Sequence, residues 1–130
     1  MYEPIRTKSV HTATAPRLPR RSRDEELDLQ LAGHLAALLT VTDELRGSAP
    51  CPELDRAAEQ LAEVVARLHH GRPPLRLPAG RGAGDPARTA ALHRRAHALA
   101  GRALVVAESR QDTEAVALAE RRLAVHAATV

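Results

Sequence analysis

The chain has 130 residues, a formal net charge of +3 and 44% hydrophobic residues. This length fits one domain, and no apolar run approaches the about 20 residues of a membrane-spanning helix, so we expect no membrane partner. A single cysteine, Cys51, excludes an internal disulfide and suits a reducing compartment. We therefore expect a cytoplasmic protein, and the single Lys and the absence of Asn and Phe are typical of a bacterial genome of high GC content.

Positive charge is concentrated at the N-terminus. Residues 1–23 carry a net charge of +5, so the rest of the chain is slightly acidic. Residues 1–21 contain three prolines and no apolar periodicity, which predicts a disordered basic tail before a domain at 22–130. The basic residues of this region are Arg6, Lys8, Arg17, Arg20, Arg21 and Arg23.

The first predicted helix spans residues 22–46. Ser22 and Glu25 have the spacing of a capping box. Leucine and valine then recur at intervals of three and four residues, which lines one helical face, and His34 lies on that stripe. Arg46 followed by Gly47 is typical of a helix end, because a cation favours the negative end of the helix dipole and glycine turns left-handed.

A second helix is predicted at 52–70. It begins at Pro52, where the missing amide hydrogen costs nothing, and His69-His70-Gly71 ends it. The short connection from the first helix implies antiparallel neighbours. Residues 71–84 are rich in Gly and Pro and predict a long loop, which is either functional or slack between two hairpins. The apolar stripe is Leu54, Ala58, Leu61, Val65 and Leu68.

Residues 86–127 allow either one helix or two. Asp85-Pro86 starts the segment as a cap and a first helical residue. A single helix would be about 60 Å long, too long for a compact monomer. We therefore predict a break near Gln111, with Asp112 capping a fourth helix, giving helices at 85–110 and 112–128. The apolar pattern of the fourth helix restarts at Val116, Ala119 and Leu123.

These elements predict an all-α fold, an up-down four-helix bundle made of two helical hairpins, with a disordered basic N-terminal tail. Tyr2 is the only aromatic residue, so the core consists of Leu, Val and Ala. The lack of aromatic side chains argues against sites for flat cofactors or stacked bases.

Histidines are the candidate metal ligands. His93 and His97 are four residues apart and share a helical face, and neutral imidazole is a common metal ligand. His34 and His126 lie on or near the stripes of other helices, so a site in the bundle interior is conceivable. However, none of these histidines follows a glutamate at the Glu-x-x-His spacing of di-iron bundles. We therefore assign no metal and no cofactor, and read the four histidines as core or surface residues.

No nucleophile elbow, phosphate-binding glycine loop or zinc-ligand spacing is present, so the sequence does not indicate an enzyme. The leading hypothesis is a small interaction or regulatory protein that binds a protein partner or a second copy of itself through its Leu/Ala/Val faces. The alternative is nucleic-acid association through the basic tail, since Arg and Lys neutralise phosphates. The His-based metal bundle is the third hypothesis.

Overall fold

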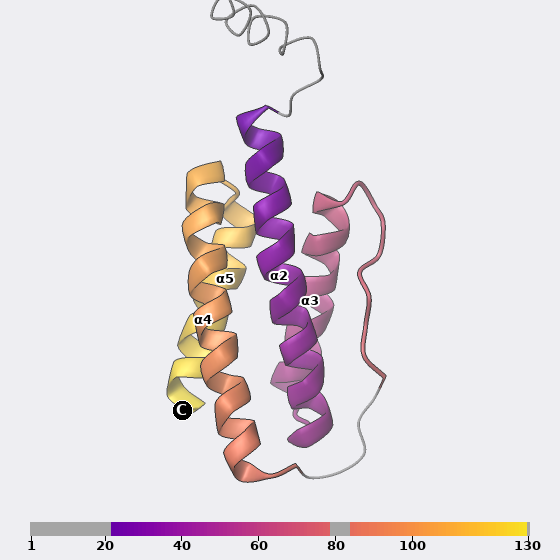
Figure 1. Cartoon of the computed structure of the whole chain (residues 1–130), viewed down its shortest axis with the longest axis vertical. Helices are drawn as coiled ribbons and strands as arrows, with labels where there is room; N and C mark the ends of the chain where they lie inside the picture. The colour runs from indigo at the N-terminus through magenta and orange to yellow at the C-terminus, as the bar shows by residue number, and fades with distance from the viewer. Residues whose placement is uncertain (1–21, 79–83, 130) are drawn as a thin grey trace, which may run out of the picture.

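The computed structural model describes residues 22–78 and 84–129, which contain four helices and no strand (Figure 1). They are α2 (Arg23–Ser48), α3 (Pro52–Leu68), α4 (Pro86–Arg110) and α5 (Thr113–Thr129). The prediction of an all-α four-helix bundle is confirmed, and each predicted helix end lies within two residues of the observed one. The predicted tail, residues 1–21, lies outside the described residues.

The chain forms two antiparallel hairpins joined by a long connection. In Figure 1, α2 descends, α3 returns upward, and the connection brings the chain back to the lower end, where α4 starts its ascent before α5 descends. Thus α3 and α4 run in the same direction. Helix α2 packs against both α3 and α4, and α4 packs against α5; of the helix pairs that touch, α3 and α5 have the smallest contact. The bundle therefore has one loosely closed side, between α3 and α5.

The first helix begins as predicted but ends later. The Glu25 amide donates to Ser22 Oγ at 3.1 Å, and the Ser22 amide donates to Glu25 Oε1 at 2.8 Å, so the capping box is present. The prediction that Gly47 ends the helix is wrong, because the helix continues to Ser48 and is capped by Ala49, whose backbone angles are no longer helical. Ala49 precedes a proline, whose ring disfavours the helical conformation of the residue before it.

The break between α4 and α5 is confirmed at Gln111. This residue adopts the left-handed conformation with φ 60°, and the amide of Asp112 donates to the carbonyl of Ala107 at 3.0 Å. The Asp112 carboxylate accepts from the amide of Ala115 at 3.1 Å and caps α5. Asp85 stands at the start of α4 as predicted, but its side chain makes no capping hydrogen bond.

The core combines leucines, most of them from α2 and α3, with valines of α3 and alanines of α4 and α5. Small alanines let α4 and α5 approach closely, which compensates for the absence of aromatic side chains. The stripes predicted for α3 and for most of α2 are buried. The fully buried leucines of α2 are Leu31, Leu35, Leu38, Leu39 and Leu45.

Two predicted core assignments differ from the structure. His34, placed on the core stripe of α2, is only half-buried. Helix α5 is rotated relative to the predicted stripe, so that Val116 and Leu123 are half-buried at the edge of the core. Ala119 is buried as predicted, and the buried face also contains two polar residues. That face is Ala115, Leu118, Ala119, Arg122 and His126.

Candidate functional site

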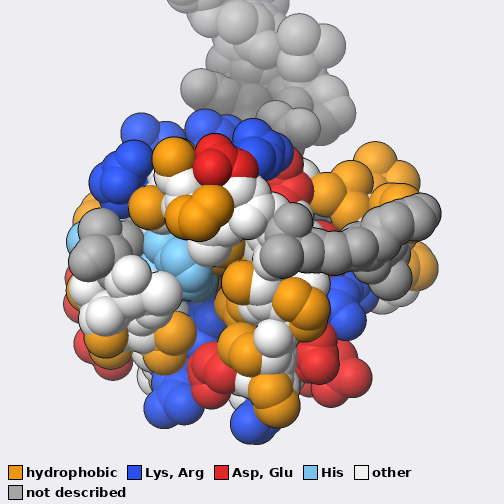
Figure 2. Space-filling model, turned by 90° about the horizontal axis from the view of Figure 1, so that it is seen from below, with side chains coloured by type: hydrophobic (Ala, Val, Ile, Leu, Met, Phe, Trp, Pro, Cys, Tyr) orange, Lys and Arg blue, Asp and Glu red, His pale blue; other side chains and the backbone are white. Residues whose placement is uncertain are grey.

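A buried polar cluster lies between α3, α4 and α5 in the lower part of the bundle. Arg122 of α5 is 1% exposed and His126, one turn later, is 0% exposed. His93 of α4 is also buried, and Glu53 of α3 reaches the cluster from the partly exposed start of its helix. Figure 2 shows histidine, arginine and acidic side chains close together at this end of the molecule.

Arg122 has only part of its hydrogen-bonding capacity satisfied. Its Nη2 donates to Oε2 of Glu53, while Nε and Nη1 have no partner among the described residues. Arg121, which is exposed, donates from Nη2 to the other oxygen of Glu53 at 3.1 Å. The hydrogen bond from Arg121, with the charge of Arg122, holds the pKa of Glu53 below its usual value. Two guanidinium groups therefore share one carboxylate.

His93 and His126 face each other through the same ring atom. Their Nδ1 atoms are 2.9 Å apart, so one ring donates a proton and the other accepts it. Burial, followed by the charge of Arg122, lowers the pKa of His126 to about 4, and burial also lowers the pKa of His93. The pKa of His126 is lower in the folded state than its ordinary 6.5. As the pH falls from 6.5 toward 4, the unfolded chain therefore takes up a proton that folded His126 does not, and the free energy of unfolding decreases. The pair is therefore neutral at neutral pH, and His126 Nε2 has no partner among the described residues.

Of the four histidines considered as metal ligands, the structure brings two together. His93 and His126 are in contact, and exposed His97 lies near enough to influence the titration of His126. His34 projects from α2 and makes no contact with that pair that the structure records. Across residues 22–78 and 84–129, no group of three or more His, Cys, Asp or Glu side chains is arranged to hold a metal ion.

A second notable feature is the strap, the described segment 72–78 of the predicted Gly/Pro loop. It is attached to the bundle by Asp43 of α2, whose side chain is 1% exposed. The Asp43 carboxylate accepts from Arg76 Nε and Nη2, both at 2.9 Å, from the Leu77 amide at 3.2 Å and from Arg46 Nη1 at 3.1 Å. Burial by itself raises the pKa of Asp43, but these hydrogen bonds outweigh it and hold the pKa below its usual value.

Two leucines of the strap are exposed, Leu75 at 94% and Leu77 at 41%. Leu75 precedes the anchored Arg76. Leu75 also borders a groove of about 380 Å³ between α2, the end of α3 and the strap. Hydrophobic side chains stand out at one edge of the molecule in Figure 2. The groove is lined by Ala36, Ala37, Thr40, Val65, His69, Arg72, Pro73, Pro74 and Leu75.

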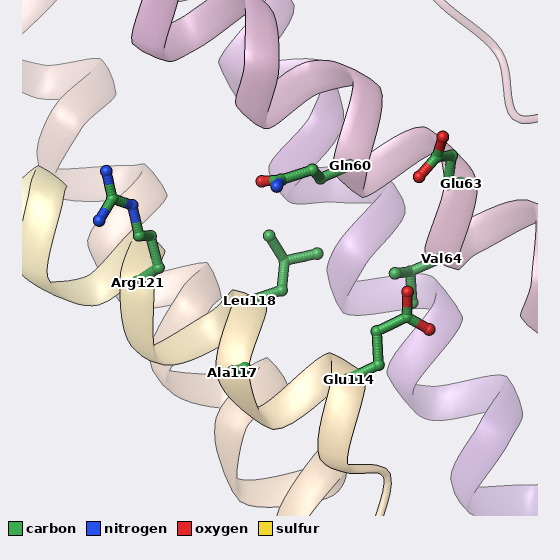
Figure 3. Close-up of a pocket in the computed structure, with 7 residues that line it drawn as sticks. All are labelled: Gln60, Glu63, Val64, Glu114, Ala117, Leu118 and Arg121. Atoms are coloured by element: carbon green, nitrogen blue, oxygen red, sulfur yellow. The ribbon is translucent and has the colours of Figure 1, made fainter.

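The loosely closed side between α3 and α5 contains another groove, of about 320 Å³. In Figure 3, Leu118 projects from α5 toward Gln60 of α3. Ion pairs join the two helices at either end: Arg67 with Asp112 and Glu114, each at 3.0 Å, and Glu53 with the paired arginines of α5. The lining is Gln60, Glu63, Val64, Glu114, Ala117, Leu118 and Arg121, mostly polar at its rim.

The structure describes one of the six basic residues predicted to form a binding tail. Arg23 is exposed in the first turn of α2. The other five, Arg6, Lys8, Arg17, Arg20 and Arg21, lie outside the described residues.

The residues that stand out in the structure, Asp43, Arg76 and Arg122, were not identified from the sequence. A weak signal was available for two of them. Asp43 follows Leu39 by four residues, and Arg122 follows Leu118 by four, so both lie on buried helical faces. A charged residue on such a face needs a partner. Sequence spacing did not reveal those partners, because Arg76 is 33 residues from Asp43 and Glu53 is 69 from Arg122.

No helix in the described part of the chain is both long and apolar enough to cross a membrane. No family model, curated protein or solved structure matches the chain.

Proposed function

We propose that this protein is a non-enzymatic helical interaction protein that associates with a second copy of itself through the strap and the neighbouring groove. The observation that carries the proposal is Leu75, which is 94% exposed although it lies on a segment fixed to the core by Asp43. An isolated exposed leucine on a mobile loop needs no explanation. A leucine held outward by a buried charge has the properties of an interface anchor, because a preorganised contact loses little entropy on binding.

A second copy is the occupant that this face fits best. Two-fold symmetry requires one patch to complement itself, since each subunit presents the same surface to the other. Leu75 and the groove adjoin each other, so each copy offers one apolar projection and one cavity. The groove, at about 380 Å³, exceeds the roughly 150 Å³ that accommodates a benzene molecule, and Ala36 and Ala37 allow close approach.

Leu75→Asp is expected to weaken self-association about 30-fold or more, because a buried anchor contributes about 2 kcal/mol and a buried carboxylate would lack a partner. Light scattering after size exclusion, over a dilution series, measures this. The matched control is Val105→Asp on α4, which replaces another exposed apolar residue, 64% exposed, away from the strap. A wild-type chain that stays monomeric at millimolar concentration, or equal effects of both substitutions, would contradict the proposal.

Nucleic-acid association through the tail is the second candidate. The six basic residues of 1–23 favour it, and on α4 Arg95 and Arg102 are also exposed on the described body. Arg88, seven residues before Arg95 on the same face of α4, instead pairs with Glu44 at 2.8 Å. Phosphate contacts depend on counterion release, so binding by the tail must weaken with salt.

A gel-shift comparison of the full chain with a variant lacking residues 1–21 tests this candidate. If the five basic residues removed all contact phosphates, the logarithm of the binding constant should fall with that of the salt concentration with a slope of about −4 to −5. The shortened chain should lose this dependence. Equal and negligible binding by both proteins would exclude the tail as a nucleic-acid contact.

A further inference from the structure

The buried guanidinium of Arg122 has more donors than the fold uses. Its Nε and Nη1 have no partner among the described residues, and neither has Nε2 of His126 on the same face one turn later. An unsatisfied buried polar group costs about 1–3 kcal/mol, so proteins rarely keep several together. A buried arginine whose donors are left over is well suited to receive a ligand that supplies acceptors.

The surroundings of Arg122 favour a negative ligand. Arg121 and Arg122 carry two positive charges against the single carboxylate of Glu53. The start of α3, a 17-residue helix, contributes the partial positive charge of the helix dipole, and Cys51 at its N-cap supplies no side-chain capping hydrogen bond. The neighbouring histidine pair is neutral. The cluster thus retains an excess of positive charge.

The carboxylate of Glu53 lies between Arg122 and solvent. The Glu53 side chain is 31% exposed, whereas that of Arg122 is 1% exposed, so the carboxylate extends from the guanidinium toward solvent. Glu53 can turn aside without losing all its partners, because its second oxygen is held by exposed Arg121. A guanidinium binds a carboxylate or phosphate with two donors, either Nη1 and Nη2 or Nε and Nη2. Glu53 occupies Nη2, so it blocks both modes of binding at Arg122.

We infer that Arg122 and His126, beside the start of α3, form a binding site for a small oxyanion, and that Glu53 occupies the site as an internal substitute until the ligand displaces it. A carboxylate or a phosphate has the required acceptors. The bound oxyanion accepts from Arg122 Nη2, which Glu53 otherwise occupies, and from the Arg122 nitrogens that Glu53 leaves without a partner. This inference concerns the lower end of α3 and α5 and is independent of the strap face.

Thermal unfolding of the full chain in inorganic phosphate, acetate or chloride, at equal ionic strength and neutral pH, tests the inference. We expect a saturable rise in the unfolding temperature of the wild type with phosphate, acetate or both, beyond that in chloride. Arg122→Met should abolish this rise. Arg23→Gln is the matched control, since it removes one positive charge from an exposed arginine at the start of α2, the end of the bundle opposite the start of α3 (Figure 1), and should keep the rise.

Glu53→Gln distinguishes the displacement model from general salt stabilisation. If Glu53 leaves Arg122 accessible about one-tenth of the time, removing its charge tightens oxyanion binding about tenfold. Phosphate is also excluded from protein surfaces and stabilises most folds, but that effect is neither saturable nor dependent on Arg122. Equal rises in wild type and Arg122→Met, or no change in affinity with Glu53→Gln, would overturn the inference.

An NMR titration of the wild type keeps the test independent of variant stability. The Nε–H resonance of Arg122 and the ring resonances of His126 should shift with phosphate or acetate and reach saturation. The Nε–H resonance of exposed Arg23, in the first turn of α2, should not respond. Resonances of Arg122 and His126 that do not respond to either anion would refute the site, whatever the behaviour of the variants.

Discussion

Asp43→Ala is expected to lower the free energy of unfolding by about 3 kcal/mol and to abolish self-association. Breaking a buried ion pair by removing one partner typically costs about 3–5 kcal/mol. The lower end of that range applies here, because Arg46 and Arg76 are 32% and 37% exposed and can recover water. The amide of Leu77 also loses its acceptor, so the strap is released from α2.

Asp55→Ala provides the matched control for this effect. Asp55 pairs with the same Arg46 at 2.9 Å, but its side chain is 58% exposed. Exposed ion pairs contribute about 0–1 kcal/mol, so this substitution should change stability little. Urea denaturation measures both variants, and trypsin cleavage after Arg76 should accelerate only in Asp43→Ala. Similar stability losses in the two variants would show that the buried anchor has no special role.

Acid should reproduce part of the Asp43 effect. The pKa of Asp43 is lower in the folded state than its ordinary 3.8, so the ionised carboxylate stabilises the fold above that value. This stabilisation is lost as the pH falls below 3.8 and the carboxylate gains a proton. The Asp43→Ala variant lacks this contribution and should show a smaller loss over the same pH range.

Glu53→Gln and Arg122→Met are expected to have unequal effects on stability. Removing the Glu53 charge leaves the buried guanidinium without its counter-charge and should cost about 2–3 kcal/mol, reduced from the fully buried case because Glu53 is partly exposed. Arg122→Met removes the charge together with its two unsatisfied nitrogens and fills the same space. Exchanges of this kind are often neutral or stabilising, so we expect a change below about 1 kcal/mol.

The double variant Glu53→Gln/Arg122→Met completes this comparison. It should recover most of the stability lost in Glu53→Gln, because no buried charge then lacks a partner. Arg121→Gln, at an exposed position beside Arg122, should change stability by less than about 1 kcal/mol. Urea denaturation of the four variants measures the set. A large loss of stability in Arg122→Met would mean that Arg122 stabilises the fold. Its two nitrogens without partners would then not destabilise the folded state.

The predictions for Asp43 and for the pair of Glu53 and Arg122 concern buried charges whose partners cannot be identified from sequence patterns. The capping box at Ser22, the proline starts of α3 and α4 and the break at Gln111 were predicted correctly, because each depends on residues within one helical turn. The rotation of α5 was not. Val116 and Leu123 were assigned to the core on hydrophobicity, whereas the structure buries Arg122 and His126.

The sequence by itself determined the number of helices, most of their ends and which faces of α3 and most of α2 are buried, since local hydrogen bonding and apolar periodicity decide these features. The tertiary structure alone decided that Asp43 meets Arg76, that Arg122 meets Glu53 and that a hydrogen bond joins the Nδ1 atoms of two histidines. These contacts join residues 33 to 69 positions apart, so they depend on how the hairpins pack and how the long connection returns. The same packing leaves Leu75 exposed and Arg122 with unused donors, and both proposals rest on those two residues.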